Sequence, residues 1–341
     1  MKTNTKVGIL IVVAFFFASF SYYAYQICFT PNLQVGMGPK MLYIPTGSKY
    51  MDVANTLKDG NYLVDKLSFS FMAKLMGYQD KVKPGAYLIP ENSTNLQVVR
   101  MLKNGQQSPV KLTFNNLRLK SDLIDMLDKK LEPSSEQIAA ILNNPDSVSK
   151  FGFDTTTIVC MFIPNTYEMF WNVSARGLVK RMDKEYKRFW NDERLAKAKT
   201  LGLSPVQVTV LASITEAETK KADEMPRVAG VYLNRLNKGM ELQADPTVVF
   251  AVGDFTIKRV RAGHKQKDSP YNTYMYHGLP PGPINLPSIT AIDAALSPEK
   301  HNYLYFCARE DFSGYHNFSD DFQKHLQNAR IYQKALDAAG Y

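Results

Sequence analysis

Cysteine is scarce in this chain: its 341 residues include only Cys28, Cys160 and Cys307, which lie far apart. Three scattered cysteines exclude a disulfide framework and a cysteine-based zinc site. The five histidines contain no H-E-x-x-H pattern, and the chain has no P-loop, no dinucleotide-binding glycine motif and no Ser/His/Asp triad signature. We therefore expect neither a metal nor a cofactor.

Clustered basic residues are also missing, although the net charge is +9. No dense Lys/Arg patch is interleaved with aromatic residues, which argues against a nucleic-acid partner. The positive charge favours an anionic surface or polymer as neighbour, and a merely soluble basic exterior explains it equally well. The length and the 45% hydrophobic content indicate a globular protein of more than one domain.

Charge is absent from residues 7–27, which are long and apolar enough to span a bilayer. Lys2 and Lys6 precede this run and the next basic residue is Lys40, so the positive-inside rule places residues 1–6 in the cytoplasm. A cleaved signal peptide is the competing interpretation, but no small-residue cleavage site follows. We predict an uncleaved single-pass transmembrane helix, with the rest of the chain outside the cytoplasm.

A repeated pattern follows a short linker over residues 28–40. Each copy predicts a strand, a turn, a serine N-cap, a short amphipathic helix and a C-terminal glycine. Two copies are too few for a solenoid, so we predict a small α+β domain over residues 41–108. The first copy is Ile44-Pro45-x-x-Ser48 with Leu57-Lys58-x-Gly60, and 45 residues later it returns as Ile89-Pro90-x-x-Ser93 with Leu102-Lys103-x-Gly105.

Residues 109–200 are predicted to form a helical connector. Its amphipathic patterns indicate three helices, and the last is charged on its solvated face. The expected helices are one capped by Ser121 that runs to Leu131, one that starts at Ser134 or Ser135 and ends at Leu142, and one over residues 176–199.

Two glutamates lie near the end of the helix that Ser204 and Pro205 are predicted to begin. Leu211, Ile214 and Glu218 share one stripe of this helix, while Glu216 lies about 200° away from Glu218. A carboxyl group held against apolar neighbours has a raised pKa, as a general acid near neutral pH requires. Helical geometry therefore favours Glu218 over Glu216 as a catalytic acid.

Several polar residues in the following segments are candidates for binding a sugar. We expect Gln243, Asp245, Asn272 and Tyr274 to contact substrate, since amides and carboxylates bond to hydroxyl and N-acetyl groups and aromatic rings pack on sugar faces. Asp245 has a second interpretation, as the cap of a helical segment that starts at Pro246. The segments are ITEAET (214–219), VAGVYLNRL (228–236), GMELQADPTV (239–248), SPYNTY (269–274) and GLPPGPI (278–284), the last expected to wall a groove.

In this order and at these spacings, the motifs resemble the catalytic domain of the MltG/YceG family of membrane-anchored endolytic murein transglycosylases. The resemblance implies that Glu218 is the catalytic acid, at the second Glu of an E-x-E-T motif, and that His316 has a structural or substrate-side role. Asn165 stands where the family usually has Asp, and Ala217 replaces a common Lys. The implied organisation is an α+β protein with a LysM-like domain over residues 41–108 and a catalytic domain over residues 201–341.

The resemblance also implies a reaction, a location and partners. Glu218 would protonate the MurNAc–GlcNAc bond of nascent peptidoglycan, the C6 hydroxyl of MurNAc would close on C1, and the resulting 1,6-anhydro ends would limit strand length. The catalytic domain would lie in the periplasm at the inner membrane, with peptidoglycan synthases as partners. Two alternatives stay open: a hydrolase with Asp245 as second carboxylate, and a non-catalytic anchored peptidoglycan-binding protein acting through residues 41–108. The domain over residues 41–108 could also be a plain spacer between the membrane and the rest of the chain.

Overall fold

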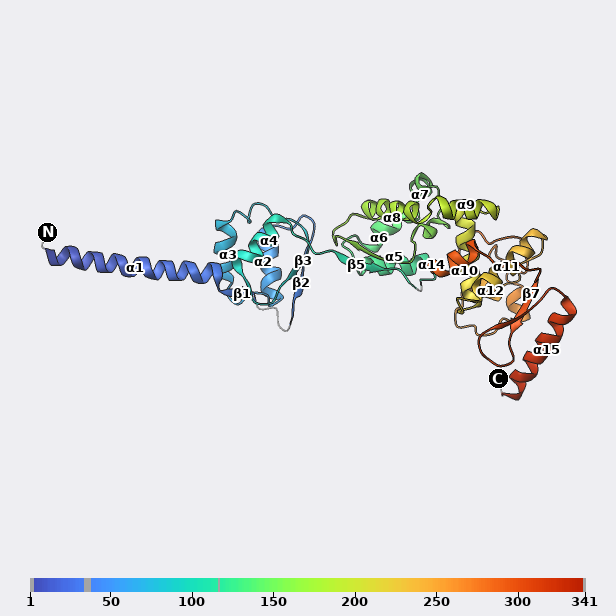
Figure 1. The fold of residues 1–341 in the computed structure, drawn as a ribbon. Helices are drawn as coiled ribbons and strands as arrows, with labels where there is room; N and C mark the ends of the chain where they lie inside the picture. The colour runs from blue at the N-terminus through green and yellow to red at the C-terminus, as the bar shows by residue number, and fades with distance from the viewer. Residues whose placement is uncertain (1–2, 34–37, 116, 340–341) are drawn as a thin grey trace. The chain divides into compact units, whose positions relative to one another are not determined.

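The computed structural model describes residues 3–33, 38–115 and 117–339 (Figure 1). The chain divides into two compact units. The N-terminal unit comprises Met1–Leu112, Lys130–Pro133 and Glu168–Ser174, and the C-terminal unit comprises Thr113–Lys129, Ser134–Tyr167 and Ala175–Tyr341. Helices and strands are mixed in the chain, as the predicted α+β class requires, while the predicted division into a LysM-like domain, a connector and a catalytic domain stays a prediction.

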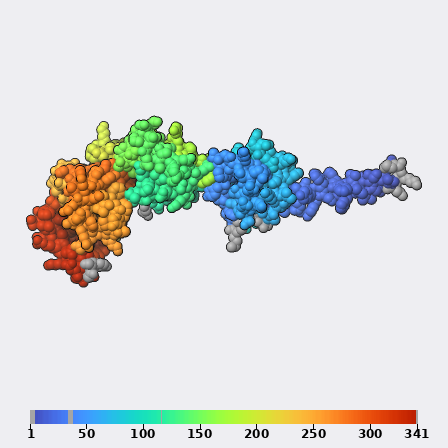
Figure 2. All heavy atoms as spheres, turned by 180° about the vertical axis from the view of Figure 1, so that it is seen from behind, coloured from blue at the N-terminus to red at the C-terminus, as the bar shows by residue number. Residues whose placement is uncertain are grey.

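The apolar N-terminal segment forms one helix, α1 (Thr3–Phe29). Its side chains are exposed along most of the helix, which Figure 2 shows uncovered by other atoms. Its last turn packs against the rest of the N-terminal unit: Ile27 is buried, and its carbonyl accepts a hydrogen bond from the Asn95 amide at 3.0 Å. The helix is long and apolar enough to cross a membrane, a test that a signal sequence also passes.

The two repeat copies form equivalent elements in the N-terminal unit. Strand β2 (Lys40–Ile44) pairs antiparallel with β3 (Gly85–Ile89), and the strands are followed by helices α2 (Tyr50–Asp59) and α4 (Asn95–Asn104). Between the copies lies α3 (Lys66–Leu75), which the repeat did not predict. The short strands β1 (Pro31–Leu33) and β4 (Ser93–Thr94) form a second antiparallel pair.

The predicted serine caps of this repeat are wrong by one residue. The N-cap residues are Lys49 and Thr94, and the Thr94 hydroxyl accepts the Gln97 N–H at 3.2 Å. Ser93 instead donates its hydroxyl to the Pro90 carbonyl at 2.6 Å, which closes the turn before the cap.

Residues 110–169 form short elements. Helix α5 starts at Lys120 after Leu119, so the predicted Ser121 cap is wrong, whereas the Ser134 cap of α6 is confirmed by its bond to the Gln137 N–H. The elements in order are β5 (Val110–Thr113), α5 (Lys120–Asp128), α6 (Ser135–Leu142), α7 (Pro145–Val148), the 3₁₀ turns η1 (Ser149–Phe151) and η2 (Ile158–Met161), and β6 (Thr166–Met169), which pairs with β5.

The predicted single helix over residues 176–199 is two helices, α8 (Ala175–Phe189) and α9 (Asp192–Thr200). The break follows from local chemistry, since the Asn191 side chain accepts the Arg194 N–H at 3.0 Å and caps α9. Trp190, between the two helices, is buried in the core of the C-terminal unit. A helical charge pattern alone did not reveal this cap.

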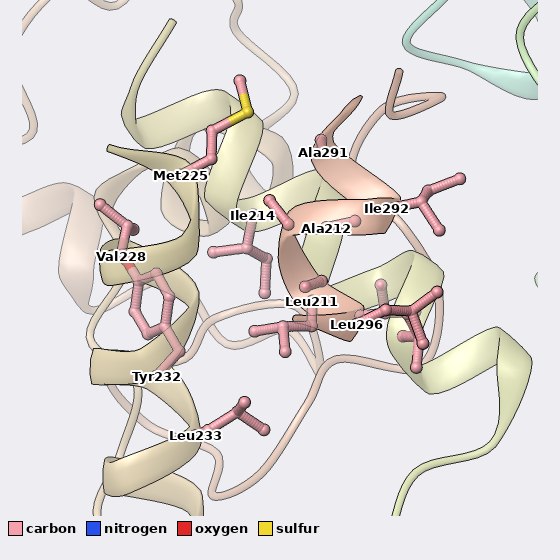
Figure 3. Close-up of a cluster of buried hydrophobic side chains, with 14 of the residues drawn as sticks. Leu211, Ala212, Ile214, Met225, Val228, Tyr232, Leu233, Ala291, Ile292 and Leu296 are labelled. Atoms are coloured by element: carbon pink, nitrogen blue, oxygen red, sulfur yellow. The ribbon is translucent and has the colours of Figure 1, made fainter. Parts of the chain in front are cut away.

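The core of the C-terminal unit lies between three helices, α10 (Pro205–Glu218), α11 (Met225–Asn237) and α14 (Ile289–Leu296) (Figure 3). Helix α10 begins as predicted, with the Ser204 hydroxyl accepting the Gln207 N–H and Pro205 in the first turn. Its residues from Val208 to Thr215 are all buried. The remaining elements are α12 (Asp245–Val252), α13 (Ala262–Lys265), the antiparallel strands β7 (Tyr305–Ala308) and β8 (His316–Ser319), and α15 (Phe322–Ala338).

Candidate active site

Glu218 is the last residue of α10 and lies where two pockets of the C-terminal unit meet. The larger, of about 700 Å³, is called the Glu218 groove here, and the smaller has about 260 Å³. Glu218 and Asp245 line both. The groove adds an apolar wall of Phe250, Phe255, Ile257, Ile284 and Leu286, and the smaller pocket adds the polar residues Tyr232, Arg235, Gln243, Tyr274, His316 and His325.

Burial raises the pKa of Glu218 to about 7, from an ordinary value of 4.5. The hydroxyl of Tyr232 donates to the Glu218 carboxylate at 2.7 Å and opposes this rise, while the nearby charge of Asp245 adds to it. Leu211 and Ile214, which share the stripe with Glu218, are fully buried. A carboxyl group poised near neutral pH can both give and take a proton.

Glu216 also reaches the groove, but it has a structural bond. Its carboxylate accepts the backbone N–H of Ser288 at 3.0 Å, at the residue that caps α14. This contact fixes the start of a core helix against α10. The two glutamates thus differ in their surroundings: Glu216 is held by a backbone hydrogen bond, whereas burial raises the pKa of Glu218.

Helix α11 supplies two side chains behind Glu218. Arg235 is buried, and its guanidinium donates to the carbonyls of Leu304, Leu242 and Glu241 at 2.6, 2.9 and 3.1 Å. Arg235 therefore has a structural role, which holds the end of α11 against the chain before β7 and before α12. The sequence analysis did not predict the bond of Tyr232 to Glu218, although a buried tyrosine hydroxyl usually needs a polar partner.

Asp245 and Tyr274 form a pair on the other side of Glu218. The Tyr274 hydroxyl donates to Asp245 at 2.6 Å, and the Lys265 ammonium lies 3.8 Å from the same carboxylate and 4.1 Å from the Tyr274 ring centre. The capping interpretation of Asp245 is wrong, because Ala244 occupies the N-cap position of α12. Gln243, just before, is exposed with a positive φ of 51° and lines the smaller pocket.

Asn272 is fully buried. Its amide donates to the carbonyls of Lys265 and Lys267 at 2.9 and 2.8 Å, and its side-chain oxygen accepts the Tyr274 N–H at 3.1 Å. A direct sugar contact does not fit this burial. The side chain instead fixes the loop that presents Tyr274.

The GLPPGPI segment borders the groove through Ile284, whose N–H donates to the Ser213 hydroxyl at 3.1 Å. The adjacent Asn285 donates its amide to the Ser213 carbonyl at 2.9 Å, and its side-chain oxygen is buried with no partner among the described residues. Gly282 is closely packed, because a Cβ there would lie 2.8 Å from Thr156 Cγ2 and 2.9 Å from the Tyr271 hydroxyl. Asn285 is a groove residue that no sequence signal indicated.

His316 lines the smaller pocket and is held by a buried carboxylate. Glu224 accepts the His316 backbone N–H at 2.8 Å, and its other oxygen lies 2.8 Å from His316 Nδ1. The pairing fixes β8 on the start of α11. Asn165 has a local role: its side chain accepts the Thr166 N–H at 2.7 Å and its carbonyl accepts the Phe114 N–H at 3.1 Å.

Together these contacts form a site suited to acid–base chemistry: one carboxyl of raised pKa, bonded to a tyrosine, at the junction of two pockets. The sequence profile of the YceG-like family matches residues 42–331. The chain belongs to the YceG-like family.

Three comparisons support this assignment. The chain is 27% identical to the endolytic murein transglycosylase of Bacillus subtilis, over 79% of this chain and 78% of that protein. It is 26% identical to the endolytic murein transglycosylase of Streptococcus pneumoniae D39, over 84% of this chain, and it spans only 58% of that longer protein. The crystal structure of a putative YceG-like protein from Listeria monocytogenes matches with a TM-score of 0.56 and 26% identity, over 85% of this chain and 98% of that one.

The Tyr232 bond predicts a shift in pH dependence. The substitution Tyr232→Phe removes the donor that stabilises the charged form of Glu218, so the pKa of Glu218 rises further. An acid is active while protonated, so we expect the alkaline limb of kcat/KM to move upward by about one pH unit. A pH–rate profile of wild type and Tyr232→Phe measures it. A lower rate with an unmoved limb would reduce Tyr232 to a packing residue.

Proposed function

We propose that this chain is an endolytic murein transglycosylase that uses Glu218 as its only acid and base. The observation that carries the proposal is the Glu218 carboxyl with a pKa of about 7 at the junction of two pockets. Family membership and the names of the relatives supply the substrate class, the murein glycan strand.

The proposed reaction returns its catalyst unchanged. Protonated Glu218 gives its proton to the oxygen of the MurNAc–GlcNAc bond, and the bond from that oxygen to C1 of MurNAc breaks. The Glu218 carboxylate then takes the proton of the MurNAc C6 hydroxyl, whose oxygen bonds to C1. The products are a 1,6-anhydro-MurNAc end and a GlcNAc end, and no water is consumed.

The neighbours of Glu218 would assist this cycle in different ways. Tyr232 orients the carboxylate and keeps its pKa from rising beyond the neutral range. Asp245 and Gln243, with Tyr274 fixed by Asp245, would contact sugar groups from the pocket walls. We assign Asn272 an indirect role through the Tyr274 loop, in place of the direct contact expected from the sequence.

The proposed location of the protein at the membrane rests on helix α1. An uncleaved α1 would hold the C-terminal unit at the periplasmic face of the inner membrane, beside nascent strands, so that cleavage inside them limits their length. Peptidoglycan synthases are the partners that such a position would bring close. Protease protection of the intact chain in vesicles would test the orientation.

Product analysis tests the reaction. We expect mass spectrometry of murein strands digested with the full chain to show internal fragments that end in 1,6-anhydro-MurNAc. Asp245→Asn should lower the rate without changing the chemistry of the ends. Reducing ends instead, lost in Asp245→Asn, would establish a hydrolase with two carboxylates. Strand binding without any cleavage would leave the binding-protein alternative.

A further inference from the structure

Four cationic side chains line the Glu218 groove and take no part in the proposed chemistry. Arg118, Lys220, Lys258 and Arg259 are all exposed, and together they are called the cationic rim here. They come from the segment before α5, from the segment just after α10 and from the loop between α12 and α13. Within residues 3–33, 38–115 and 117–339, none of the four forms an ion pair.

The acidic residues of the groove do not neutralise this rim. Glu216 accepts the Ser288 N–H, and Asp245 accepts the Tyr274 hydroxyl with Lys265 beside it. Glu218, with its pKa raised to about 7, carries only part of a negative charge at neutral pH. The groove therefore presents an excess of positive charge beside the proposed acid.

Two members of the rim are held in place by neighbours. The guanidinium of Arg118 lies 4.4 Å from the Phe255 ring centre, and Arg259 donates to the Gln333 side chain at 3.3 Å. Both contacts leave the cations in the groove lining. Cations that are fixed in advance lose less conformational freedom when an anion arrives.

The rest of the groove suits a neutral sugar. Phe250, Phe255 and Ile284 offer an apolar surface, and Asn285 supplies an amide, so sugar faces and hydroxyl groups have partners without the rim. An uncharged glycan would leave the four cations unused. Murein differs from such a glycan because the lactyl arm of each MurNAc ends in carboxylates, either those of a stem peptide or its own.

We propose that the cationic rim binds the carboxylates carried on the lactyl arm of MurNAc and so selects charged strands. This inference rests on the proposed function. Ion pairs from three separate segments around the groove would align the arm and thereby place the adjacent glycosidic bond at Glu218. The rim residues act as specificity-determining side chains and do not touch the reacting atoms.

Binding by the full chain carrying Glu218→Gln tests the inference without cleavage. Fluorescence anisotropy would compare labelled peptide-bearing strands with the same strands after amidation of their carboxylates by methylamine. We expect amidation to weaken binding about tenfold, and salt to weaken binding only of the charged strands. Peptide-free strands, in which the lactyl arm ends in its own carboxylate, separate the two sources. Equal affinity would show that the rim accepts either carboxylate, and weaker affinity would assign the carboxylates of the stem peptide.

Charge-matched variants locate the effect. The rim variant carries three more substitutions in the Glu218→Gln parent: Lys220→Gln, Lys258→Gln and Arg259→Gln. We expect it to bind charged strands about tenfold more weakly than the parent, and to bind charged and amidated strands equally. The control changes the exposed residues Lys238, Lys300 and Lys334 to Gln, outside the Glu218 groove, and should bind as the parent does.

The inference and the proposed function fail in different ways. Equal affinity of the parent for charged and amidated strands, with the wild type still cleaving murein, would overturn the role of the rim alone. If the rim variant still preferred charged to amidated strands as strongly as the parent does, the role of the rim would likewise be overturned. Absence of binding to every strand, with no cleavage by the wild type, would overturn the proposed function itself.

Discussion

Glu218→Gln is expected to slow strand cleavage by about 10²–10⁴-fold, the usual contribution of a positioned general acid and base. Glutamine keeps the size of the side chain and can still accept the Tyr232 hydroxyl, but it carries no proton that can be transferred. The rate of release of anhydro-ended fragments, measured at pH 6, would record the loss. Folding should be retained, because an amide replaces a carboxyl group whose charged form burial disfavours.

Glu216→Gln is the matched control, two residues earlier on the same helix. Its side-chain oxygen can still accept the Ser288 N–H, so we expect a rate within a few-fold of wild type. Activity that survives in Glu218→Gln and disappears in Glu216→Gln would refute the assignment of the acid. Loss in both variants, with both folded, would point to a shared pair of carboxylates.

Arg235→Met is expected to have the largest effect on stability, lowering the free energy of unfolding by about 3–5 kcal/mol. The substitution fills much of the volume but leaves the carbonyls of Leu304 and Leu242 without their donor. Leu242 lines the smaller pocket, so activity should fall with stability. Urea unfolding of the C-terminal unit provides the measurement.

The two tryptophans allow this unfolding to be followed separately. Trp190 belongs to the core of the C-terminal unit, whereas Trp171 belongs to the N-terminal unit. In a Trp171→Phe background, tryptophan fluorescence therefore reports on unfolding of the C-terminal unit alone. Arg188→Met, at an exposed position of α8, is the control and should change stability by less than about 0.5 kcal/mol. An equal effect at both positions would refute the importance of the buried guanidinium.

The helices with strong local signals were predictable. The Ser204–Pro205 start of α10 and the Ser134 cap of α6 were confirmed, because a capping hydroxyl acts within three residues of its own position. Where a side chain makes another local hydrogen bond, the predicted helix boundary was wrong. The cap predicted at Ser93 was displaced by one residue, and the break at Asn191 was not predicted. Neither bond changes the hydrophobic periodicity that identifies a helix.

The candidate site was predictable in its residue types but not in its contacts. The stripe of Leu211, Ile214 and Glu218 depends on helical period alone, so the sequence by itself singled out the carboxyl group with the raised pKa. The order of its motifs likewise determined the family, which the profile match confirms. The stripe and the motifs each lie within a short segment, so they can be recognised without knowing which distant residues are in contact.

Only the tertiary structure decided which distant side chains meet. It brought Tyr232 to Glu218, Tyr274 to Asp245, and Glu224 to His316, and it buried Asn272 where a sugar contact was expected. It also gathered the cationic rim from three segments around one groove. Such pairings depend on packing of the whole core, because each side chain is positioned by neighbours remote in sequence.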